Sequence, residues 1–127
     1  MFNTLLVEDN VSYRQTLSDA LYLHFPLIAV DEAGDGREAL RMVEYRRPDL
    51  IFMDIQLPGK NGLDVTKEIK RVYNEIVIVI LTSNGAPEVR QLAYRNGADY
   101  FLSKDDEFCM ENILTRVDVV LARVSRH

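Results

Sequence analysis

Side chains that could bind a metal ion and react with a phosphoryl group follow short apolar runs of this sequence. The pairs of run and polar residue are Phe2–Val7 with Glu8 and Asp9, Leu50–Met53 with Asp54, Ile76–Leu81 with Thr82 and Ser83, and Tyr100–Leu102 with Lys104. A fifth run, Leu27–Val30, is followed by Asp31 and Glu32. Carboxylates, hydroxyls and one ammonium therefore recur at the same place in successive segments.

The carboxylates favour a site for a hard divalent cation. Ionised carboxylates repel one another at close range unless an opposite charge lies between them. Mg²⁺ is held by one or two carboxylates together with water and phosphate oxygens, so a phosphoryl group could sit beside it. Asp54 is the best candidate nucleophile, because the turns at Pro58-Gly59 and Asn61-Gly62 predict an open loop after it. Its attack on phosphorus would give an acyl phosphate, with Lys104 and Thr82 as donors to the phosphoryl oxygens.

These residues can meet only if the apolar runs are strands of one parallel sheet. The runs are short, β-branched and continuous, as expected for strands buried on both faces. The segments between them carry helical periodicity, for example at Leu17, Leu21 and His24, and at Val65, Ile69 and Val72. Strand and helix alternate five times, which predicts a parallel sheet with helices on both faces. Ligands of such sheets bind at the carboxyl ends of the strands.

Local signals predict the ends of several helices and the surroundings of two isolated residues. Ser12, Asp35 and Ser103 are predicted N-caps, each with a polar or acidic residue three positions later. His24 is predicted to lie in the core or at a helix end. Cys109 is predicted to be a small apolar filler or a residue of a helix surface.

Length and charge restrict the possible functions. The chain has 127 residues, which we interpret as one domain over residues 1–127, and a net charge of −5. This charge argues against direct nucleic-acid binding by the domain. No apolar stretch is long enough to span a membrane, and one cysteine cannot form an internal disulfide. We therefore expect a cytoplasmic protein.

Four segments together resemble a response-regulator receiver domain of two-component signalling, over essentially the whole chain. They are LLVEDN with Glu8 and Asp9, MDIQLPGKNG with Asp54, VIVILTSN with Thr82, and GADYFLSK with Lys104. The resemblance implies a flavodoxin-like (βα)5 fold with strand order 2-1-3-4-5. It also implies a phosphorylation-dependent switch rather than an enzyme acting on other molecules.

The resemblance also implies roles for the residues of the pocket. Asp54 would accept a phosphoryl group from a sensor histidine kinase or a phosphotransfer protein. Asp9, Asp54 and the backbone carbonyl of Gln56 would bind Mg²⁺ directly, and Glu8 would act through water. Lys104 would contact the phosphoryl group.

Further residues would set the response and its duration. Thr82 would move toward the phosphoryl group and Phe101 would turn inward in response. Gln56, Ser83 and Asn84 would influence how long the phosphoryl group survives.

Output would pass through the fourth helix, fifth strand and fifth helix, which could also form a homodimer. Lys104 is followed by Asp105, where many receivers have proline. This departure hints at a parent protein with a C-terminal DNA-binding domain and a role in transcription.

Three other functions fit parts of the pattern. A Mg²⁺-dependent phosphatase or dehalogenase would also use a strand-end aspartate, but it usually has a second acid two positions later, where this chain has Gln56. A flavin-binding relative of flavodoxin would need a phosphate-binding loop, where this chain has Glu8-Asp9-Asn10. A receiver that binds proteins without being phosphorylated would not need the acidic residues.

Overall fold

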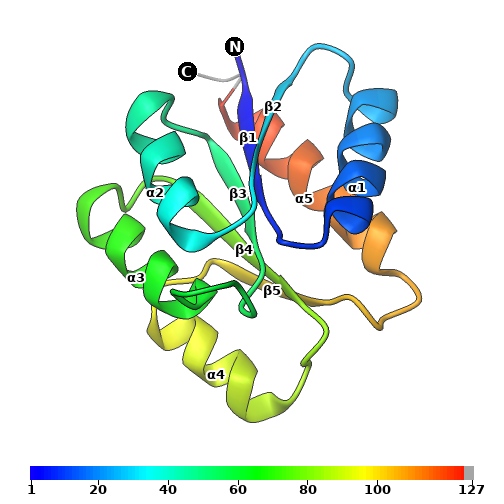
Figure 1. Ribbon diagram of the computed structural model, residues 1–127. Coiled ribbons are helices and arrows are strands. Elements are labelled where there is room, and N and C mark those ends of the chain that lie inside the picture. Colours follow the sequence, from blue (N-terminus) through cyan, green and yellow to red (C-terminus); the bar gives the residue numbers. More distant parts are fainter. Residues whose placement is uncertain (125–127) are drawn as a thin grey trace.

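A parallel β-sheet forms the centre of the computed structural model, which describes residues 1–124 (Figure 1). Within these residues the sheet has five strands in the order β2-β1-β3-β4-β5. The strands are β1 Asn3–Val7, β2 Ala29–Ala33, β3 Leu50–Met53, β4 Val77–Thr82 and β5 Tyr100–Ser103. This order is the flavodoxin-like order predicted from the sequence.

Helices cover both faces of the sheet (Figure 1). They are α1 Val11–His24, α2 Gly36–Tyr45, α3 Gly62–Val72, α4 Pro87–Arg95 and α5 Cys109–Val124. On one face α1 and α5 pack over a cluster that includes Leu17 and Val117. On the other face α2, α3 and α4 pack over a second cluster that includes Val43, Ile69 and Ala93. The predicted architecture is therefore confirmed.

The range predicted for the second strand is wrong. The strand covers Ala29–Ala33 rather than Leu27–Val30, and Leu27 is 88% exposed. Asp31 and Glu32 therefore lie inside the strand and not after it. The physical reason is that β2 is an edge strand, of which only Ala33 is fully buried. An edge strand tolerates polar residues, so it lacks the continuous apolar run that marks β3 and β4.

Two of the three predicted N-caps are wrong. Asn10 rather than Ser12 caps α1, through a 3.0 Å bond from the Tyr13 amide to Asn10 Oδ1. Ser103 does not cap α5, because that helix begins only at Cys109. Its Oγ instead accepts from the Asp105 amide at 3.3 Å, within the loop after β5. Asp35 does cap α2, accepting from the Glu38 amide at 2.8 Å.

Residues at the helix ends also depart from the simple apolar stripe. His24 is exposed and its Nδ1 lies 3.0 Å from the Ala20 carbonyl oxygen, so it belongs to the helix end and not the core. Val72, at the last position of α3, is 69% exposed. Cys109 is buried, as predicted for an apolar filler.

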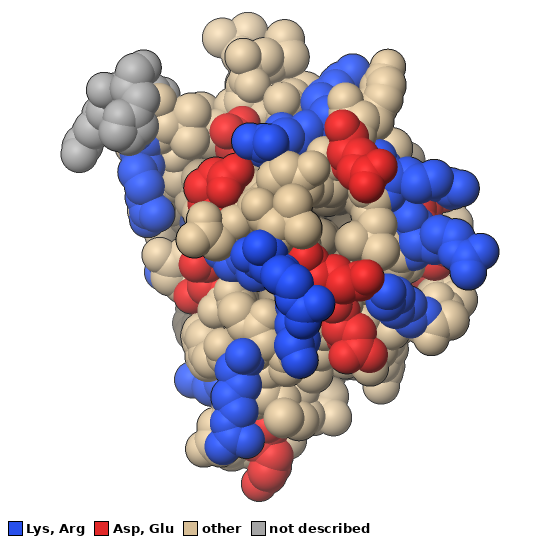
Figure 2. Space-filling view, turned by 90° about the vertical axis from the view of Figure 1, so that its left-hand side faces the viewer, with Lys and Arg blue, Asp and Glu red and all other residues tan. Residues whose placement is uncertain are grey.

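Charged side chains of both signs are interspersed over the side of the molecule where α2 and α3 lie (Figure 2). Several form ion pairs, such as Arg47 with Glu75 at 3.2 Å and Lys60 with Glu68. This face therefore presents no continuous basic surface of the kind that binds nucleic acid. Among the helices within residues 1–124, none combines the length and hydropathy that crossing a bilayer requires.

Candidate functional site: an acidic pocket at the carboxyl edge of the sheet

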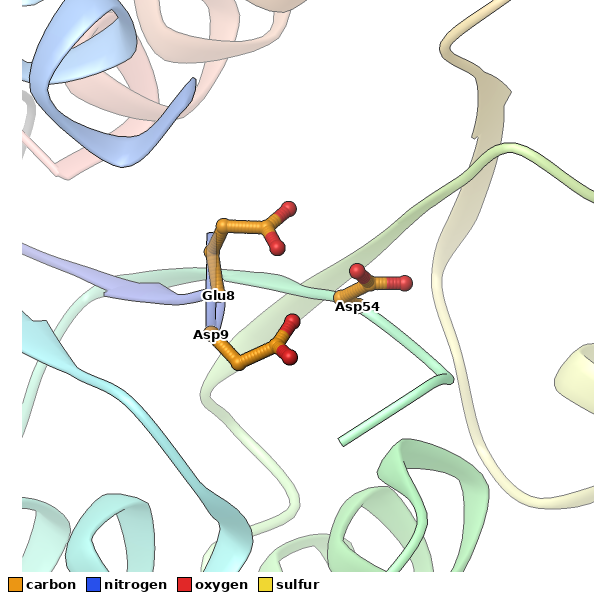
Figure 3. Close-up of side chains that lie close together, drawn as sticks. All are labelled: Glu8, Asp9 and Asp54. Carbon is orange, nitrogen blue, oxygen red and sulfur yellow. The ribbon is translucent and has the colours of Figure 1, made fainter. Parts of the chain in front are cut away.

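Three carboxylates meet where β1 and β3 end (Figure 3). Oxygens of Glu8, Asp9 and Asp54 all lie within 4.8 Å of one another. The pairing of Val7 with Met53 in the parallel register brings the two strand ends together. Main-chain bonds hold this arrangement, since the Asp54 amide donates to the Val7 carbonyl at 3.0 Å. The convergence predicted from the sequence is therefore present in the structure.

The ammonium of Lys104 joins this cluster from the end of β5. Its Nζ lies 3.1 Å from Asp54 Oδ2 and also forms an ion pair with Glu8 Oε1. The Lys104 amide donates to the Thr82 carbonyl at 2.8 Å, which fixes the loop that carries the side chain. The single positive charge of Lys104 faces three carboxylates, so a net negative charge remains.

Burial and charge pull the pKa values of this cluster in opposite directions. Burial raises the pKa of Glu8, and the nearby Asp54 adds to this, while bonds from Lys104 and the Asn10 amide offset part of the rise. Burial by itself lowers the pKa of Lys104, but its contacts with Glu8 and Asp54 outweigh this, so that pKa is raised. The lysine is therefore held in its charged form by the carboxylates around it.

Asp54 is more enclosed than the turns after it predict. Its side chain is 8% exposed. Besides the contact with Lys104, its Oδ1 accepts from the Gln56 amide at 3.3 Å. Asp9, in contrast, is exposed, so the cluster is open to solvent on that side. A small ion would therefore approach past Asp9.

The remaining predicted site residues surround the cluster at different depths. Thr82 is fully buried and its Oγ1 accepts from the Asn84 amide at 3.4 Å. Ser83, Asn84 and Gln56 are exposed around the pocket. Phe101 is 5% exposed, so in this structure the ring already points inward.

The site contains two further residues that motif reasoning did not find. The first is Gly62, at the start of α3. A Cβ at this position would lie 1.9 Å from the Asp54 carbonyl oxygen and 2.8 Å from the Asp54 carbonyl carbon. Only glycine lets the first turn of α3 approach the backbone of Asp54 so closely. The sequence showed this glycine, but only as part of an Asn-Gly turn.

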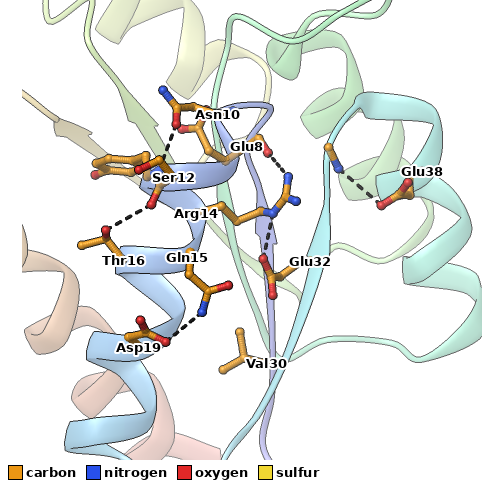
Figure 4. Close-up of polar contacts among 12 residues, drawn as sticks. Glu8, Asn10, Ser12, Arg14, Gln15, Thr16, Asp19, Val30, Glu32 and Glu38 are labelled. Carbon is orange, nitrogen blue, oxygen red and sulfur yellow. Dashed lines mark hydrogen bonds and ion pairs between the residues drawn. The ribbon is translucent and has the colours of Figure 1, made fainter.

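The second is Arg14, in α1, which connects the segment after β1 that carries Glu8 and Asp9, here called the acidic loop, to β2 (Figure 4). Its Nη1 donates to the Glu8 carbonyl oxygen at 2.6 Å, and its Nε donates to Glu32 Oε1 at 2.8 Å. The guanidinium therefore links the backbone beside Asp9 to β2, a strand that contributes no residue to the carboxylate cluster. Arg14 and Glu32 are 18 positions apart, so the sequence carries no local signal of this bridge.

We expect replacement of Arg14 with methionine, which keeps the stem but not the guanidinium, to loosen the acidic loop. Loss of charge-assisted bonds should lower the free energy of unfolding by about 1.5 kcal/mol. Affinity for Mg²⁺ should fall by about tenfold, as for other residues that orient metal ligands. Urea denaturation and Mg²⁺ titrations followed by amide chemical shifts measure the two effects. Arg41→Met, at an exposed position of α2, is the matched control, and equal Mg²⁺ affinities of both variants would contradict the prediction.

Residues 4–118 match the family model of the response regulator receiver domain. The chain belongs to this family. It is 31% identical over 121 residues to the response regulator MprA of Mycolicibacterium vanbaalenii, covering 95% of this chain and 51% of that protein. It is 33% identical over 119 residues to MprA of Mycobacterium leprae, covering 94% and 50%. The chain thus spans about half the length of the curated relatives it matches.

Solved structures of other receivers share the fold. The chain is 31% identical to the Vibrio cholerae chemotaxis protein CheY4, with a TM-score of 0.82 over 94% of this chain and 98% of that one. A two-component response regulator from Clostridium difficile is 25% identical, with a TM-score of 0.86 and 98% of each chain covered. Receiver domains are signalling switches of two-component systems and not classical enzymes. They bind Mg²⁺ in an acidic pocket and typically interact with a histidine kinase.

The acidic pocket of this chain fits such an ion. Its side-chain donors are all oxygens, within reach of one centre, and their charge exceeds that of Lys104. Hard divalent cations prefer such oxygen donors. Asp9, Asp54 and Glu8 are therefore suitable to hold Mg²⁺.

Proposed function

We propose that this domain is a switch controlled by phosphorylation of Asp54, supplied by a sensor histidine kinase or a phosphotransfer protein. The observation that carries the proposal is the meeting of Lys104 with the Glu8, Asp9 and Asp54 carboxylates at one edge of the sheet. A purely structural set of polar residues would not need a net negative charge at this point. Membership of the receiver family supports the same function.

The transfer uses the Asp54 carboxylate as the nucleophile. One of its oxygens forms a bond to the phosphorus of phosphohistidine while the phosphorus–nitrogen bond breaks. The electron pair of the broken bond stays with the histidine nitrogen, and the product is an acyl phosphate on Asp54. Lys104, already 3.1 Å from Asp54 Oδ2, neutralises charge on the transferred group. The domain thus promotes its own phosphorylation and dephosphorylation without acting on other substrates.

Asp9, Asp54 and the Gln56 carbonyl would hold Mg²⁺, with Glu8 acting through water. When bound, the ion offsets charge on the carboxylates and on the phosphoryl oxygens. Gln56, Ser83 and Asn84, all exposed around the pocket, would control the access of water to the acyl phosphate and hence its lifetime.

Thr82 and Phe101 would carry the signal away from the pocket. The added phosphoryl oxygens attract the Thr82 hydroxyl, whose present bond to the Asn84 amide is long at 3.4 Å. The Arg90 guanidinium of α4 lies over the Phe101 ring, 5.5 Å from the ring centroid. A shift of β4 and β5 would therefore move α4 through this contact.

The output surface would be formed by α4, β5 and α5. Through it the domain would act on an effector or form a homodimer. Transcription control by a DNA-binding effector is one form of this proposal. It accords with relatives about twice as long as this chain. A cytoplasmic site of action remains a prediction.

Treatment with acetyl phosphate and Mg²⁺, followed by intact mass measurement, tests the proposal. We expect one phosphoryl group per chain, formed only with a divalent cation and removed by hydroxylamine, which cleaves acyl phosphates. Turnover of phosphomonoesters without an adduct would instead indicate a phosphatase. Absence of any adduct would favour a receiver that binds partners unphosphorylated, and bound flavin would contradict a signalling role.

Mg²⁺ should stabilise the domain, because it relieves repulsion that exists only in the folded state. At a concentration about tenfold above its dissociation constant, linkage predicts a gain of about 1.4 kcal/mol in the free energy of unfolding. Asp9→Asn should lose most of this gain, and should be no less stable than the parent chain without metal. Thermal unfolding with and without Mg²⁺, against Asp19→Asn as the control, measures this. An equal Mg²⁺ effect in the parent chain and Asp9→Asn would show that Asp9 is not a ligand.

A further inference from the structure

We propose that Tyr13 is a positioning residue for Lys104. Its aromatic ring would hold the ammonium in place and so promote phosphorylation of Asp54. The inference rests on the proposed function, but the contact that carries it is present in the unphosphorylated domain. The Lys104 Nζ lies 4.5 Å from the centroid of the Tyr13 ring. A cation at this distance over an aromatic face is attracted by the electron density of the ring.

The ring supplies a contact that the carboxylates cannot. Glu8 and Asp54 both attract the ammonium, and Lys104 bonds to both. Once Mg²⁺ and a phosphoryl group share the pocket, these carboxylates would be engaged by the ion and by the new acyl phosphate. The Tyr13 face carries no charge and coordinates no metal, so its attraction for the ammonium remains. It therefore keeps Lys104 over the reacting oxygen when the other contacts change.

The position of Tyr13 in the fold makes its ring a fixed support. It lies in the first turn of α1, where its amide donates to Asn10 Oδ1 at 3.0 Å. The ring is half-buried, and with Leu17, Phe52 and Leu81 it lines a cavity of about 10 Å³ below the carboxylates. This volume holds at most a single water molecule, so the side chain has little space to move.

The surroundings also keep the ring neutral. Burial, the neighbouring Cys109, and the Glu8 and Asp54 carboxylates all raise the pKa of Tyr13. The hydroxyl therefore stays protonated. A phenolate would form a competing ion pair with Lys104, whereas the neutral ring presents only its face.

Two substitutions separate the ring from the hydroxyl. Tyr13→Phe keeps the aromatic face, and Tyr13→Leu keeps an apolar side chain without one. With acetyl phosphate and saturating Mg²⁺, we expect Tyr13→Leu to form the Asp54 adduct about tenfold more slowly than the parent chain. Tyr13→Phe should remain within about twofold. Tyr45→Leu is the matched control, since Tyr45 is an exposed tyrosine with Arg46 6.0 Å from its ring, away from the pocket.

An NMR measurement tests the contact without any phosphorylation. The Lys104 ε-methylene protons should be shifted upfield by the ring current in the parent chain and in Tyr13→Phe, and should return to ordinary values in Tyr13→Leu. If Tyr13→Leu does not fold, Tyr13→Met serves as a second variant without a ring. Thermal unfolding of each variant shows whether a slow reaction reflects a loss of structure.

The outcomes distinguish the inference from the function on which it rests. An upfield shift together with no adduct in the parent chain would overturn the proposed function while the contact stands. An adduct in the parent chain that forms equally fast in Tyr13→Leu would overturn the role of the ring. Equal slowing in Tyr13→Phe and Tyr13→Leu would assign the effect to the hydroxyl and overturn it as well.

Discussion

Asp54→Asn should eliminate the phosphoryl adduct entirely. The amide has the same shape as the carboxylate but lacks a nucleophilic oxygen, so no acyl phosphate can form. Intact mass after treatment with acetyl phosphate and Mg²⁺ should therefore show unmodified protein. The same substitution at Asp64, an exposed residue in the first turn of α3, should leave the adduct unchanged. Stoichiometric phosphorylation of Asp54→Asn at another residue would contradict the assignment of the acceptor.

The same variant should be at least as stable as the parent chain. Asp54 shares a cluster within 4.8 Å with Glu8 and Asp9, and Lys104 offsets only part of their charge. Removing one like charge should raise the free energy of unfolding by about 1 kcal/mol without Mg²⁺. The gain should shrink when Mg²⁺ is added, because the ion stabilises the parent chain more. Loss of function without loss of stability would show that Asp54 serves chemistry and not folding.

Gly62→Ala should destabilise the domain and impair phosphorylation together. The new Cβ would lie 1.9 Å from the Asp54 carbonyl oxygen and 3.0 Å from the Ile55 Cα, which are backbone atoms. Either α3 or the loop carrying Asp54 must shift. We expect a loss of about 3 kcal/mol in the free energy of unfolding. We also expect phosphorylation to slow by about a hundredfold, because the nucleophile leaves its position beside Lys104.

The matched control for this prediction is Gly34→Ala. Its Cβ would meet only the Arg14 Nη1 at 3.5 Å, which is ordinary van der Waals contact. Urea denaturation and the rate of adduct formation should differ little from those of the parent chain. If Gly62→Ala behaved in the same way, the close approach of α3 to Asp54 would have no functional weight.

The edge at which the polar residues gather could be predicted from the alternation of strands and helices, and the strand order followed from the resemblance to receiver domains. Each polar residue of the cluster follows an apolar run, and parallel strands end at the same edge of their sheet. The prediction succeeded for β1, β3 and β4, where burial on both faces requires continuous apolar residues, and for the edge strand β5, whose run Tyr100–Leu102 is also apolar. It failed for β2, where an edge position permits Asp31 and Glu32 inside the strand.

The helix ends show the limit of local patterns. Ser12 and Ser103 have the composition of N-caps, yet Asn10 caps α1 and a separate turn follows β5. Several nearby polar residues can each satisfy the free amides of a helix. Which of them does so depends on where the preceding strand ends, and the cap signature carries no information about that position.

The amino-acid sequence by itself determined the fold, the edge of the sheet that carries the pocket, and the kinds of side chain that meet there. Only the tertiary structure showed how they are held: α3 against Asp54 at Gly62, Arg14 between Glu8 and Glu32, and Tyr13 against Lys104. The reason is that apolar periodicity and residue type are properties of single segments, which a sequence records directly. Contacts between segments depend on strand register and on the approach of helices to the sheet, and these distances are set by packing of the whole domain.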